Sequence, residues 1–217
     1  MAKESGNSPP WTASTPDRIL EAAERLFSER GVGEVSLREI TSAAGVNSAA
    51  AHYHFGSKDA VLKELFARRA HPIAQRREQL LAELKRDRHG RPVLEDVLRA
   101  FLKPALDLLD TPGGVAFTQL RARMAFESEE VRWQILGQAF DRTSEMALQA
   151  LAQALPKLPQ LELYWRFHFL LGTMVYTMAR PGRIESITQG GIDTRDTTVA
   201  LEKLVRFAAA GFRAPCP

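Results

Sequence analysis

Residues 36–58 read SLREITSAAGVNSAAAHYHFGSK, and this stretch decides the fold of the N-terminal part of the chain. Ser36 and Glu39 have the spacing of a capping box, in which each side chain bonds the other residue's backbone amide at a helix N-terminus. The pattern therefore predicts a short helix after Ser36. Gly45 is suited to end that helix, because glycine readily adopts the left-handed conformation found at helix C-termini.

A second short helix is expected directly after this glycine. Asn47 or Ser48 can cap it and Gly56 breaks it, so we expect the helix over about residues 48–54. A helix end, a glycine turn and a new helix start lie within four residues of each other. Such a tight turn sets two short helices at a steep angle, which indicates a helix-turn-helix.

Two other readings of this stretch explain less. His52 and His54 suggest a metal site, but residues two apart on a helix point about 200° away from each other. Chelation from one helix needs a spacing of four, so no metal is expected. Packing accounts for the apolar positions but not for the tight turn; these positions are Ile40, Ala44, Val46, Ala51 and Phe55.

The second helix has the side chains that a DNA-reading helix needs. Ala49 and Ala50 are small enough to let it seat in the major groove and touch thymine methyl groups. Ser48 and His52 can reach base edges, and Asn47 at the start of the helix is a further DNA-binding candidate. Phosphate contacts are expected near the start of the following helix from Tyr53, His54 and Lys58.

Helical periodicity extends over the rest of the chain, which predicts an all-α fold. Thr15 can cap a first helix, Pro16 and Asp17 suit its first turn, and Gly31 ends it. Alternating runs typical of strands are absent. Further helices are expected over 58–86, 93–110, 114–127, 129–155, 160–180 and 196–213. The expected organisation is a disordered arm (1–13), a DNA-binding domain (14–58) and a helical domain (59–217).

Composition favours a soluble cytoplasmic protein. Hydrophobic residues make up 45% of the 217 residues, and Cys216 is the only cysteine, which excludes a disulfide framework. The N-terminus has no apolar segment typical of a signal peptide, and no uncharged run reaches about 18 residues, so no membrane partner is expected. Residues 58–91 are rich in Lys and Arg and include Arg76 and Arg77; such a run is usually a solvated helix face.

In its first part the sequence resembles the DNA-binding domain of the TetR family of bacterial repressors. The matching residues are ILEAAERLF at 19–27, Gly31, Ser36-Leu37-Arg38, Ile40, Ala44-Gly45-Val46, Tyr53-His54-Phe55 and Ser57-Lys58. Thr41 departs from the usual small alanine, and Ala51-His52 stands where many members have Leu-Tyr.

This resemblance implies roles for individual residues. Arg38 would reach a base from the first helix of the motif, and arginine is the commonest reader of guanine. Its alternative role is a surface ion pair with Glu34 or Glu39. Contacts to the DNA backbone and its phosphates are implied for Ser36, Tyr53 and Lys58.

The C-terminal part has many aromatic and methionine side chains that allow an apolar ligand pocket between helices. Such side chains are more often core than binding site. The candidate ligand-binding residues are Phe101, Arg121, Met124, Trp133, Phe140, Trp165, His168 and Phe169. A ligand head group could be held by Arg121, Arg123 or His168, although a hydrogen-bonded core histidine is an equal alternative for His168.

The helices expected over 160–180 and 196–213 are apolar over much of their circumference, which indicates that a partner covers them. In TetR-like proteins the last two long helices form the dimer interface. The resemblance therefore implies a homodimer on a palindromic double-stranded DNA operator, with half-sites ~34 Å apart.

The segment LPKLP at 155–159, with residues 161–172 and 207–212, further resembles the PsrA-type branch of the family, which includes fatty-acid-responsive repressors. The expected function is a repressor released by a small apolar effector, with a long-chain fatty acid or acyl-CoA favoured. The alternative is a DNA-binding regulator or architectural protein without a ligand. An enzyme is not expected, since no catalytic triad, phosphate-binding loop or cofactor motif is present.

Overall fold

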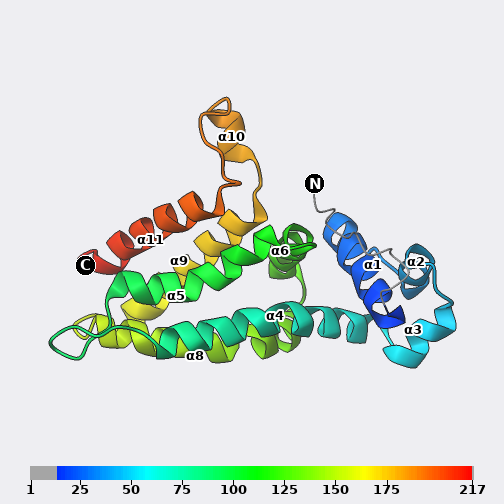
Figure 1. Cartoon of the computed structure of the whole chain (residues 1–217), viewed down its shortest axis with the longest axis horizontal. Coiled ribbons are helices and arrows are strands. Elements are labelled where there is room, and N and C mark those ends of the chain that lie inside the picture. Colours follow the sequence, from blue (N-terminus) through cyan, green and yellow to red (C-terminus); the bar gives the residue numbers. More distant parts are fainter. Residues whose placement is uncertain (1–13, 217) are drawn as a thin grey trace, which may run out of the picture. The chain divides into compact units, whose positions relative to one another are not determined.

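The structure is a computed structural model and describes residues 14–216. The chain divides after Leu65 into two compact units, which we call unit 1 (to Leu65) and unit 2 (from Phe66). The described residues form helices and no strand, with one isolated antiparallel bridge between Arg86 and Pro92 (Figure 1). The predicted all-α fold is confirmed.

Unit 1 contains the predicted helix-turn-helix and the helix before it. Its helices are α1 (Thr15–Arg30), α2 (Leu37–Ala43), α3 (Ser48–His54) and the first residues of α4 (Lys58–Ala82). α1 packs on both α2 and α3. The core consists of apolar side chains at helical spacing that are fully buried, and it includes Ile19, Ala23, Phe27, Ile40 and Ala51.

Helix α1 begins one residue earlier than the sequence suggests. The Ser14 side chain accepts a hydrogen bond from the Asp17 amide at 3.3 Å and is the N-cap, so the expected cap at Thr15 is wrong. Thr15 is the first helical residue, and Pro16 lies in the first turn as predicted. Both serine and threonine are favoured N-cap residues, and the extended backbone of Ser14 identifies it as the cap.

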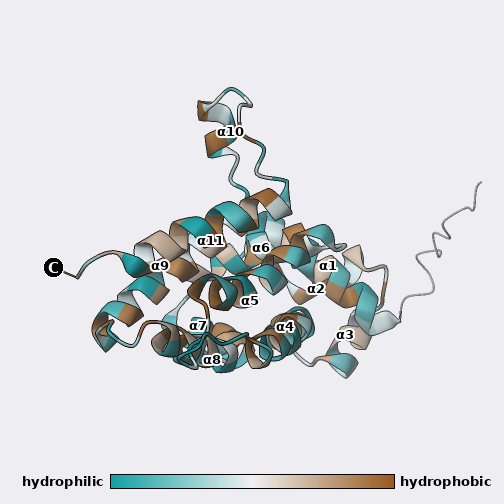
Figure 2. Cartoon of the chain, turned by 60° about the vertical axis from the view of Figure 1, so that its left-hand side comes forward, coloured by the Kyte–Doolittle hydropathy of each residue, from teal (hydrophilic) through white to brown (hydrophobic). Residues whose placement is uncertain are grey.

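Unit 2 holds the remaining helices. These are α5 (Leu94–Asp107), α6 (Gly114–Arg123), α7 (Glu129–Arg132), α8 (Gln138–Ala154), α9 (Gln160–Ala179), α10 (Arg183–Ile187) and α11 (Thr197–Arg213). Hydrophobic and hydrophilic residues alternate around them, as expected for helices that each bury one face (Figure 2). The helix expected over 58–86 ends at Ala82, and the one expected over 129–155 is interrupted by a π-helical turn at Trp133–Gly137.

The core of unit 2 is built around α5, which packs against α8 and α11, while α6 packs against α9. Phe66 of α4 lies against Phe117 of α6, with ring centroids 4.9 Å apart. Phe101 of α5 lies 5.3 Å from Phe167 of α9. These ring contacts join helices that are far apart in sequence, so the aromatic side chains fix how α4, α5, α6 and α9 assemble.

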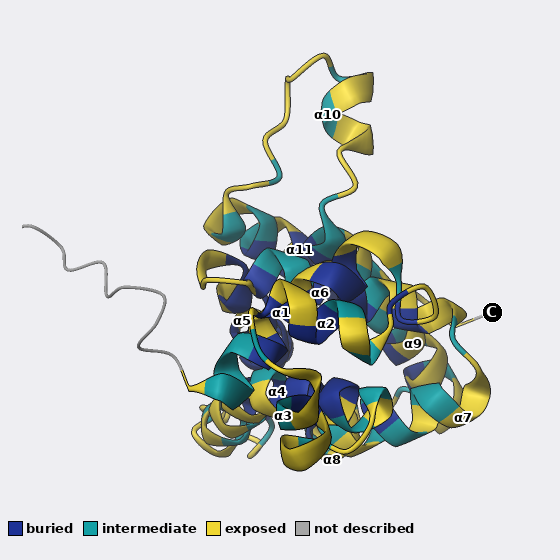
Figure 3. Cartoon of the chain, turned by 90° about the vertical axis from the view of Figure 1, so that its right-hand side faces the viewer, coloured by how far each residue is buried: buried dark blue, intermediate teal, exposed yellow. Residues whose placement is uncertain are grey.

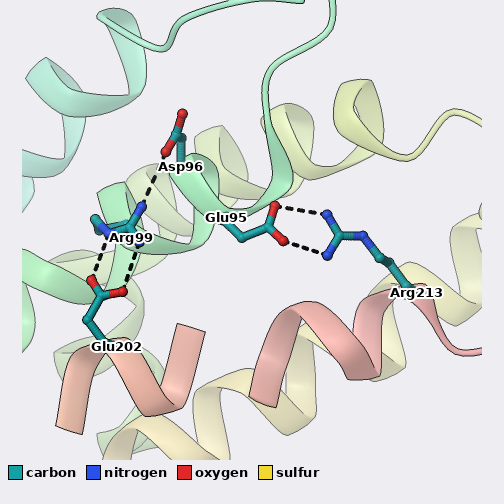
Figure 4. Close-up of polar contacts among 5 residues, drawn as sticks. All are labelled: Glu95, Asp96, Arg99, Glu202 and Arg213. Atoms are coloured by element: carbon teal, nitrogen blue, oxygen red, sulfur yellow. Dashed lines mark hydrogen bonds and ion pairs between the residues drawn. The ribbon is translucent and has the colours of Figure 1, made fainter. Parts of the chain in front are cut away.

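Ion pairs fix the register of α11 on α5 (Figure 4). Arg99 donates two hydrogen bonds of 3.1 Å to Glu202, and it also pairs with Asp96 at 3.2 Å. Further along the two helices, Arg213 donates to both carboxylate oxygens of Glu95 at 2.5 and 2.8 Å. Because these side chains are partly exposed, each ion pair contributes little to the stability of the fold. Two bidentate pairs are geometrically specific, however, and together they determine how α11 is placed along α5.

The segment between α9 and α11 carries the short helix α10, which was not expected from the sequence. It stands out from α9 and α11, and most of its residues are exposed (Figure 3). A hydrogen bond from the Thr194 hydroxyl to Glu185 closes it on itself. Arg180 begins the segment with a positive φ of 47°. Exposed isoleucines lie along it at positions 184, 187 and 192.

Candidate functional site

The predicted capping box forms at the start of α2. The Glu39 amide donates to the Ser36 hydroxyl at 3.2 Å, and the Ser36 amide donates to the Glu39 carboxylate at 2.8 Å. Arg30 at the end of α1 binds the other carboxylate oxygen at 2.8 Å. Hydrogen bonds from Ser36 and Arg30 lower the pKa of Glu39 to about 2. Glu39 therefore stays ionised and ties α2 to α1.

The turn between α2 and α3 is held by Arg18 of α1. Its Nη2 atom donates to the carbonyl oxygens of Ala44 at 2.6 Å and Gly45 at 3.0 Å. Gly45 has a φ of +62°, and a Cβ atom there would lie 2.9 Å from the same Nη2. The left-handed backbone explains the glycine, and a Cβ atom there would also displace the end of the Arg18 side chain. This arrangement sets the angle between α2 and α3.

Helix α3 presents the face that the sequence predicts. The Asn47 side chain caps it by accepting from the Ala49 amide at 2.9 Å. Ala51 is fully buried and anchors the helix on unit 1. On the opposite side, small and polar residues are exposed, and Tyr53 has 86% of its surface accessible. The exposed residues of α3 are Ser48, Ala49, His52, Tyr53 and His54, and Ala50 is half-buried.

Arg38 lies on α2 with its side chain exposed. Within residues 14–216 its guanidinium makes no hydrogen bond or ion pair, and the Glu39 carboxylate is bound by Arg30. The alternative surface ion pair with Glu34 or Glu39 is therefore not formed. An exposed guanidinium without an internal partner is available for a base edge or a phosphate.

Besides Asn47, which caps α3, three other predicted contact residues already have intramolecular hydrogen-bond partners. The Lys58 ammonium donates to the Val32 carbonyl at 2.8 Å, and the Ser36 hydroxyl donates to Glu39 at 2.7 Å. A His52 ring nitrogen lies 3.1 Å from the Gly56 carbonyl oxygen. Lysine has three N–H donors, so Lys58 keeps two for a phosphate. The predicted DNA-binding residues therefore gather on one motif, and their contacts with DNA stay a prediction.

The predicted ligand-binding residues do not form one group. Phe101, Arg121, Met124 and Phe140 are each buried in unit 2, and the Arg121 guanidinium lies over the Phe140 ring. Trp165, His168 and Phe169 form an exposed aromatic cluster on α9, in which the rings of Trp165 and Phe169 stack at 5.9 Å. Trp133 is 71% exposed, and Arg123 is exposed as well. Because His168 is exposed, it is not a core histidine.

The burial of Arg77 was not expected from the sequence. Arg77 of α4 has no accessible surface, although it lies in the basic stretch that was expected to be a solvated face. Its Nε donates to the Phe101 carbonyl at 2.8 Å, and its central carbon lies 3.9 Å above the Phe101 ring. Longer contacts reach the Thr143 hydroxyl at 3.5 Å and the Met174 sulfur at 3.6 Å.

Periodicity could have revealed this burial. Arg77 continues the buried stripe of α4 formed by Phe66, Ala70 and Ile73, whose spacing of three to four residues brings it to the same face. Arg76 beside it is exposed. The sequence therefore indicated the burial of Arg77, but the neighbouring exposed arginines and lysines made the whole stretch look like a solvated face.

Arg121 of α6 is the second buried arginine, with 9% of its surface accessible. Its central carbon lies 4.3 Å from the ring centroid of Phe140, and its buried Nη1 atom has no hydrogen-bond partner among the described residues. Burial lowers the pKa of Arg121 to about 10. Burial, together with repulsion by Arg121, lowers the pKa of Arg77 to about 9. Both side chains therefore remain positively charged at neutral pH.

An open groove runs between α9 and α11. One part of about 930 Å³ lies between Tyr176, Val199 and the loop at residues 191–194. A smaller part of about 260 Å³ continues along Leu170 and Phe212, and Phe207 lines both parts. Phe207 is 68% exposed, and exposed Phe169 and Tyr176 extend the apolar surface. This is the face that the sequence predicted to need a partner.

Within residues 14–216 there is no group of three or more His, Cys, Asp or Glu residues that could hold a metal ion. Over the same residues no helix has the length and apolar character needed to cross a bilayer.

Two family models match the chain. Residues 19–65 match the model described as bacterial regulatory proteins, tetR family. Residues 99–211 match the tetracyclin repressor-like, C-terminal domain. The two matched regions correspond to the helix-turn-helix region and to most of unit 2. The resemblance stated for the first part is confirmed, whereas the resemblance to the PsrA-type branch stays a prediction.

The chain is similar to named regulators. It is 31% identical over 142 residues to the HTH-type transcriptional repressor BepR of Brucella suis biovar 1, covering 64% of this chain and 62% of BepR. The chain thus spans less than two thirds of the length of this curated relative.

Solved structures of TetR-type regulators share the fold. The TetR family regulator PfmR from Thermus thermophilus has a TM-score of 0.65 at 20% identity, with 94% of this chain and 99% of PfmR covered. The regulator FadR from Bacillus subtilis, solved in complex with stearoyl-CoA, has a TM-score of 0.63 at 17% identity, with 89% and 97% covered.

Proposed function

The chain belongs to the TetR family of bacterial regulatory proteins, and from this we propose that it is a transcriptional repressor that binds a palindromic operator as a homodimer and is released by a small apolar effector. The observation that carries the proposal is the exposed face of α3, which packs on the helix that presents the exposed guanidinium of Arg38. BepR, which is 31% identical over 142 residues, is named as a repressor.

We assign base reading to α2 and α3. Arg38 contacts a base edge, and Ser48 and His52 contact further bases, with Ala49 and Ala50 against thymine methyl groups. Small side chains at these positions on the exposed face of α3 support this assignment. Backbone and phosphate contacts fall to residues at the ends of the motif, namely Ser36, Asn47, Tyr53, His54 and Lys58.

We assign the dimer interface to the groove between α9 and α11. Support comes from the exposed aromatic side chains that line it, above all Phe207, together with Phe169 and Tyr176. A monomer rarely exposes a contiguous apolar surface of this kind. The segment that carries α10 adds the exposed side chain of Ile192, which lines the same groove.

We assign effector binding to unit 2. The long-chain acyl class is the first candidate, supported by the fold shared with FadR, which was solved with stearoyl-CoA. The effector acts by binding one state of the dimer more tightly than the other, so that the two α3 helices no longer fit adjacent grooves.

DNA binding is tested by fluorescence anisotropy with DNA that flanks the protein's own gene, at one fixed salt concentration. Arg38→Ala should weaken binding about tenfold or more, since a good base contact contributes about 1–3 kcal/mol. Arg25→Ala, at an exposed arginine of α1, is the matched control and should bind like the unmodified protein. Equal affinities for all three proteins would refute the assigned role of Arg38.

Dimerisation is tested by light scattering. Phe207→Glu should give a monomer that loses operator affinity, whereas Phe126→Glu, at an aromatic side chain that is 92% exposed outside the groove, should stay dimeric. Oleate and oleoyl-CoA are then added to the operator complex. Operator binding that resists every apolar effector would favour the alternative, a DNA-binding protein without a ligand.

A further inference from the structure

The core of unit 2 holds two guanidinium groups, those of Arg77 and Arg121, and neither pairs with a carboxylate of the described residues. Arginine has five N–H donors. The acceptors of Arg77 are one carbonyl at 2.8 Å and two distant atoms, the Thr143 hydroxyl and the Met174 sulfur. Nη1 of Arg121 has no acceptor among the same residues. The two side chains therefore offer more donors than the fold satisfies.

Such an arrangement is unfavourable for folding. Moving a charged group from water into a protein interior is costly. Both guanidinium groups approach the same turn of α8, because Nη1 of Arg77 lies 3.5 Å from the Thr143 hydroxyl and Arg121 lies over the ring of Phe140, so their like charges add to this cost. The aromatic faces of Phe101 and Phe140 offset part of this cost, because a cation is attracted to a ring face. Apolar side chains of similar volume would pack there without any such cost. Stability alone therefore does not explain the charges.

We propose that Arg77 and Arg121 form the head-group site of unit 2 and bind the carboxylate of an apolar monocarboxylic acid. The inference rests on the proposed effector function and names the chemical class of the effector. Planar carboxylates match the fork of a guanidinium, and the charge-assisted hydrogen bonds would satisfy the donors that the fold leaves open.

The surroundings of Arg77 and Arg121 favour a ligand that has a single charge and is otherwise apolar. The two rings that cover the guanidinium groups, with Phe117, Leu120 and Met124, are buried and apolar. An acyl-CoA thioester has no charge at its acyl head, so its phosphates would have to occupy this buried site, and a phosphate group carries more charge to desolvate than a carboxylate. A free acid therefore fits the pair better than its CoA thioester does.

The pair also links the ligand to α4. Arg77 lies on this helix, whose residues up to Leu65 belong to unit 1, and Arg121 lies on α6. A carboxylate held by both arginines attaches α6 to α4. Binding of the acid therefore acts on the one helix that is part of both units.

The test compares acids with alcohols of the same carbon skeleton. Binding of decanoate, 1-decanol, 4-phenylbutanoate and 4-phenyl-1-butanol is measured by calorimetry on the full-length protein, with decanoyl-CoA as a further probe. We expect each acid to bind about tenfold or more tightly than its alcohol, since hydrogen bonds to a charged group are the stronger ones. Decanoyl-CoA should bind more weakly than decanoate.

Arg121→Met should reduce the preference for the acids to about twofold or less. Arg123→Met is the matched control on the same helix, because Arg123 is exposed, and it should keep the preference. Arg121→Lys serves as a second variant in case Arg121→Met does not fold: it keeps a charge but loses the fork, and it should bind acids less tightly than the unmodified protein.

Three results would overturn the inference: alcohols that bind as tightly as acids, a preference that survives in both Arg121 variants, or no binding of any probe. The same preparations are titrated with operator DNA. Operator binding without acid binding would refute the carboxylate site and leave the repressor function standing. Acid binding that depends on Arg121, without operator binding, would refute the repressor function and leave the site standing.

Discussion

Replacing Arg18 by methionine should loosen the helix-turn-helix without touching any proposed DNA contact. Arg18 donates to the carbonyl oxygens of Ala44 and Gly45 at 2.6 and 3.0 Å, and its side chain is half-buried. Hydrogen bonds that involve a charged group contribute about 1.5–3 kcal/mol when buried. Because one of the two bonds is exposed, we expect Arg18→Met to lower the free energy of unfolding by about 2 kcal/mol.

The assay is urea unfolding, followed by operator binding under native conditions. Arg25→Met is the control, since Arg25 lies two turns further along α1 and forms an exposed pair with Glu29 at 3.9 Å. Exposed pairs contribute at most about 1 kcal/mol, and this long one should contribute less than about 0.5 kcal/mol. Equal losses of stability in the two variants would show that Arg18 does not hold the turn.

A double-mutant cycle with Gly45→Ala sharpens the test. Alanine at a φ of +62° costs about 1–2 kcal/mol, and its Cβ would lie 2.9 Å from the Arg18 Nη2 atom. With Met at position 18 that clash disappears, so Gly45→Ala should destabilise Arg18→Met less than it destabilises the unmodified protein. Strict additivity of the two substitutions would refute the reasoning.

Three further predictions concern single residues. Gly114→Ala should destabilise unit 2 by about 3 kcal/mol or more in urea unfolding, because its Cβ would lie 1.8 Å from the Leu108 carbonyl oxygen. The pKa of Glu39 is lowered to about 2, so its stabilising effect is present above about pH 4.5 and is lost as the pH falls toward 2; Glu39→Gln should lack this dependence in acid unfolding. The pKa of Arg77 is lowered to about 9 in the folded protein, so above pH 9 the unfolded chain binds more protons than the folded protein does. The free energy of unfolding should therefore rise with pH above pH 9, and Arg77→Met should lack this rise.

Local chemistry explains why the helix-turn-helix could be predicted. Ser36, Glu39 and Gly45 act on backbone groups within four residues of themselves, so their pattern alone indicates where helices begin and end. The contact of Arg18 with the turn could not be predicted in this way, because it joins residues 26 positions apart. Helix α10 could not be predicted either, because its five residues have no periodicity of their own.

Burial of charge was the least predictable feature. Arg77 and Arg76 are neighbours in one basic stretch, yet one has no accessible surface and the other is exposed. Arg121 was expected among the head-group candidates and is buried, whereas His168 and Arg123, named for the same reason, are exposed. The type of residue does not distinguish the buried from the exposed charged side chains. The position of a residue relative to the buried stripe of its helix does, since Arg77 follows the buried Ile73 by one turn.

The carboxylate and the apolar tail of the proposed effector contribute different parts of the binding free energy. Moving a two-state protein almost completely from one state to the other requires a difference in binding of about 5.5 kcal/mol. A carboxylate held by Arg77 and Arg121 supplies about 1.5–3 kcal/mol of this. The remainder of about 3 kcal/mol corresponds to roughly four buried methylene groups at about 0.8 kcal/mol each. The arginine pair therefore selects acids, while the length of the apolar tail decides whether binding releases the operator. A short acid such as acetate should occupy the pair and leave the repressor on its DNA.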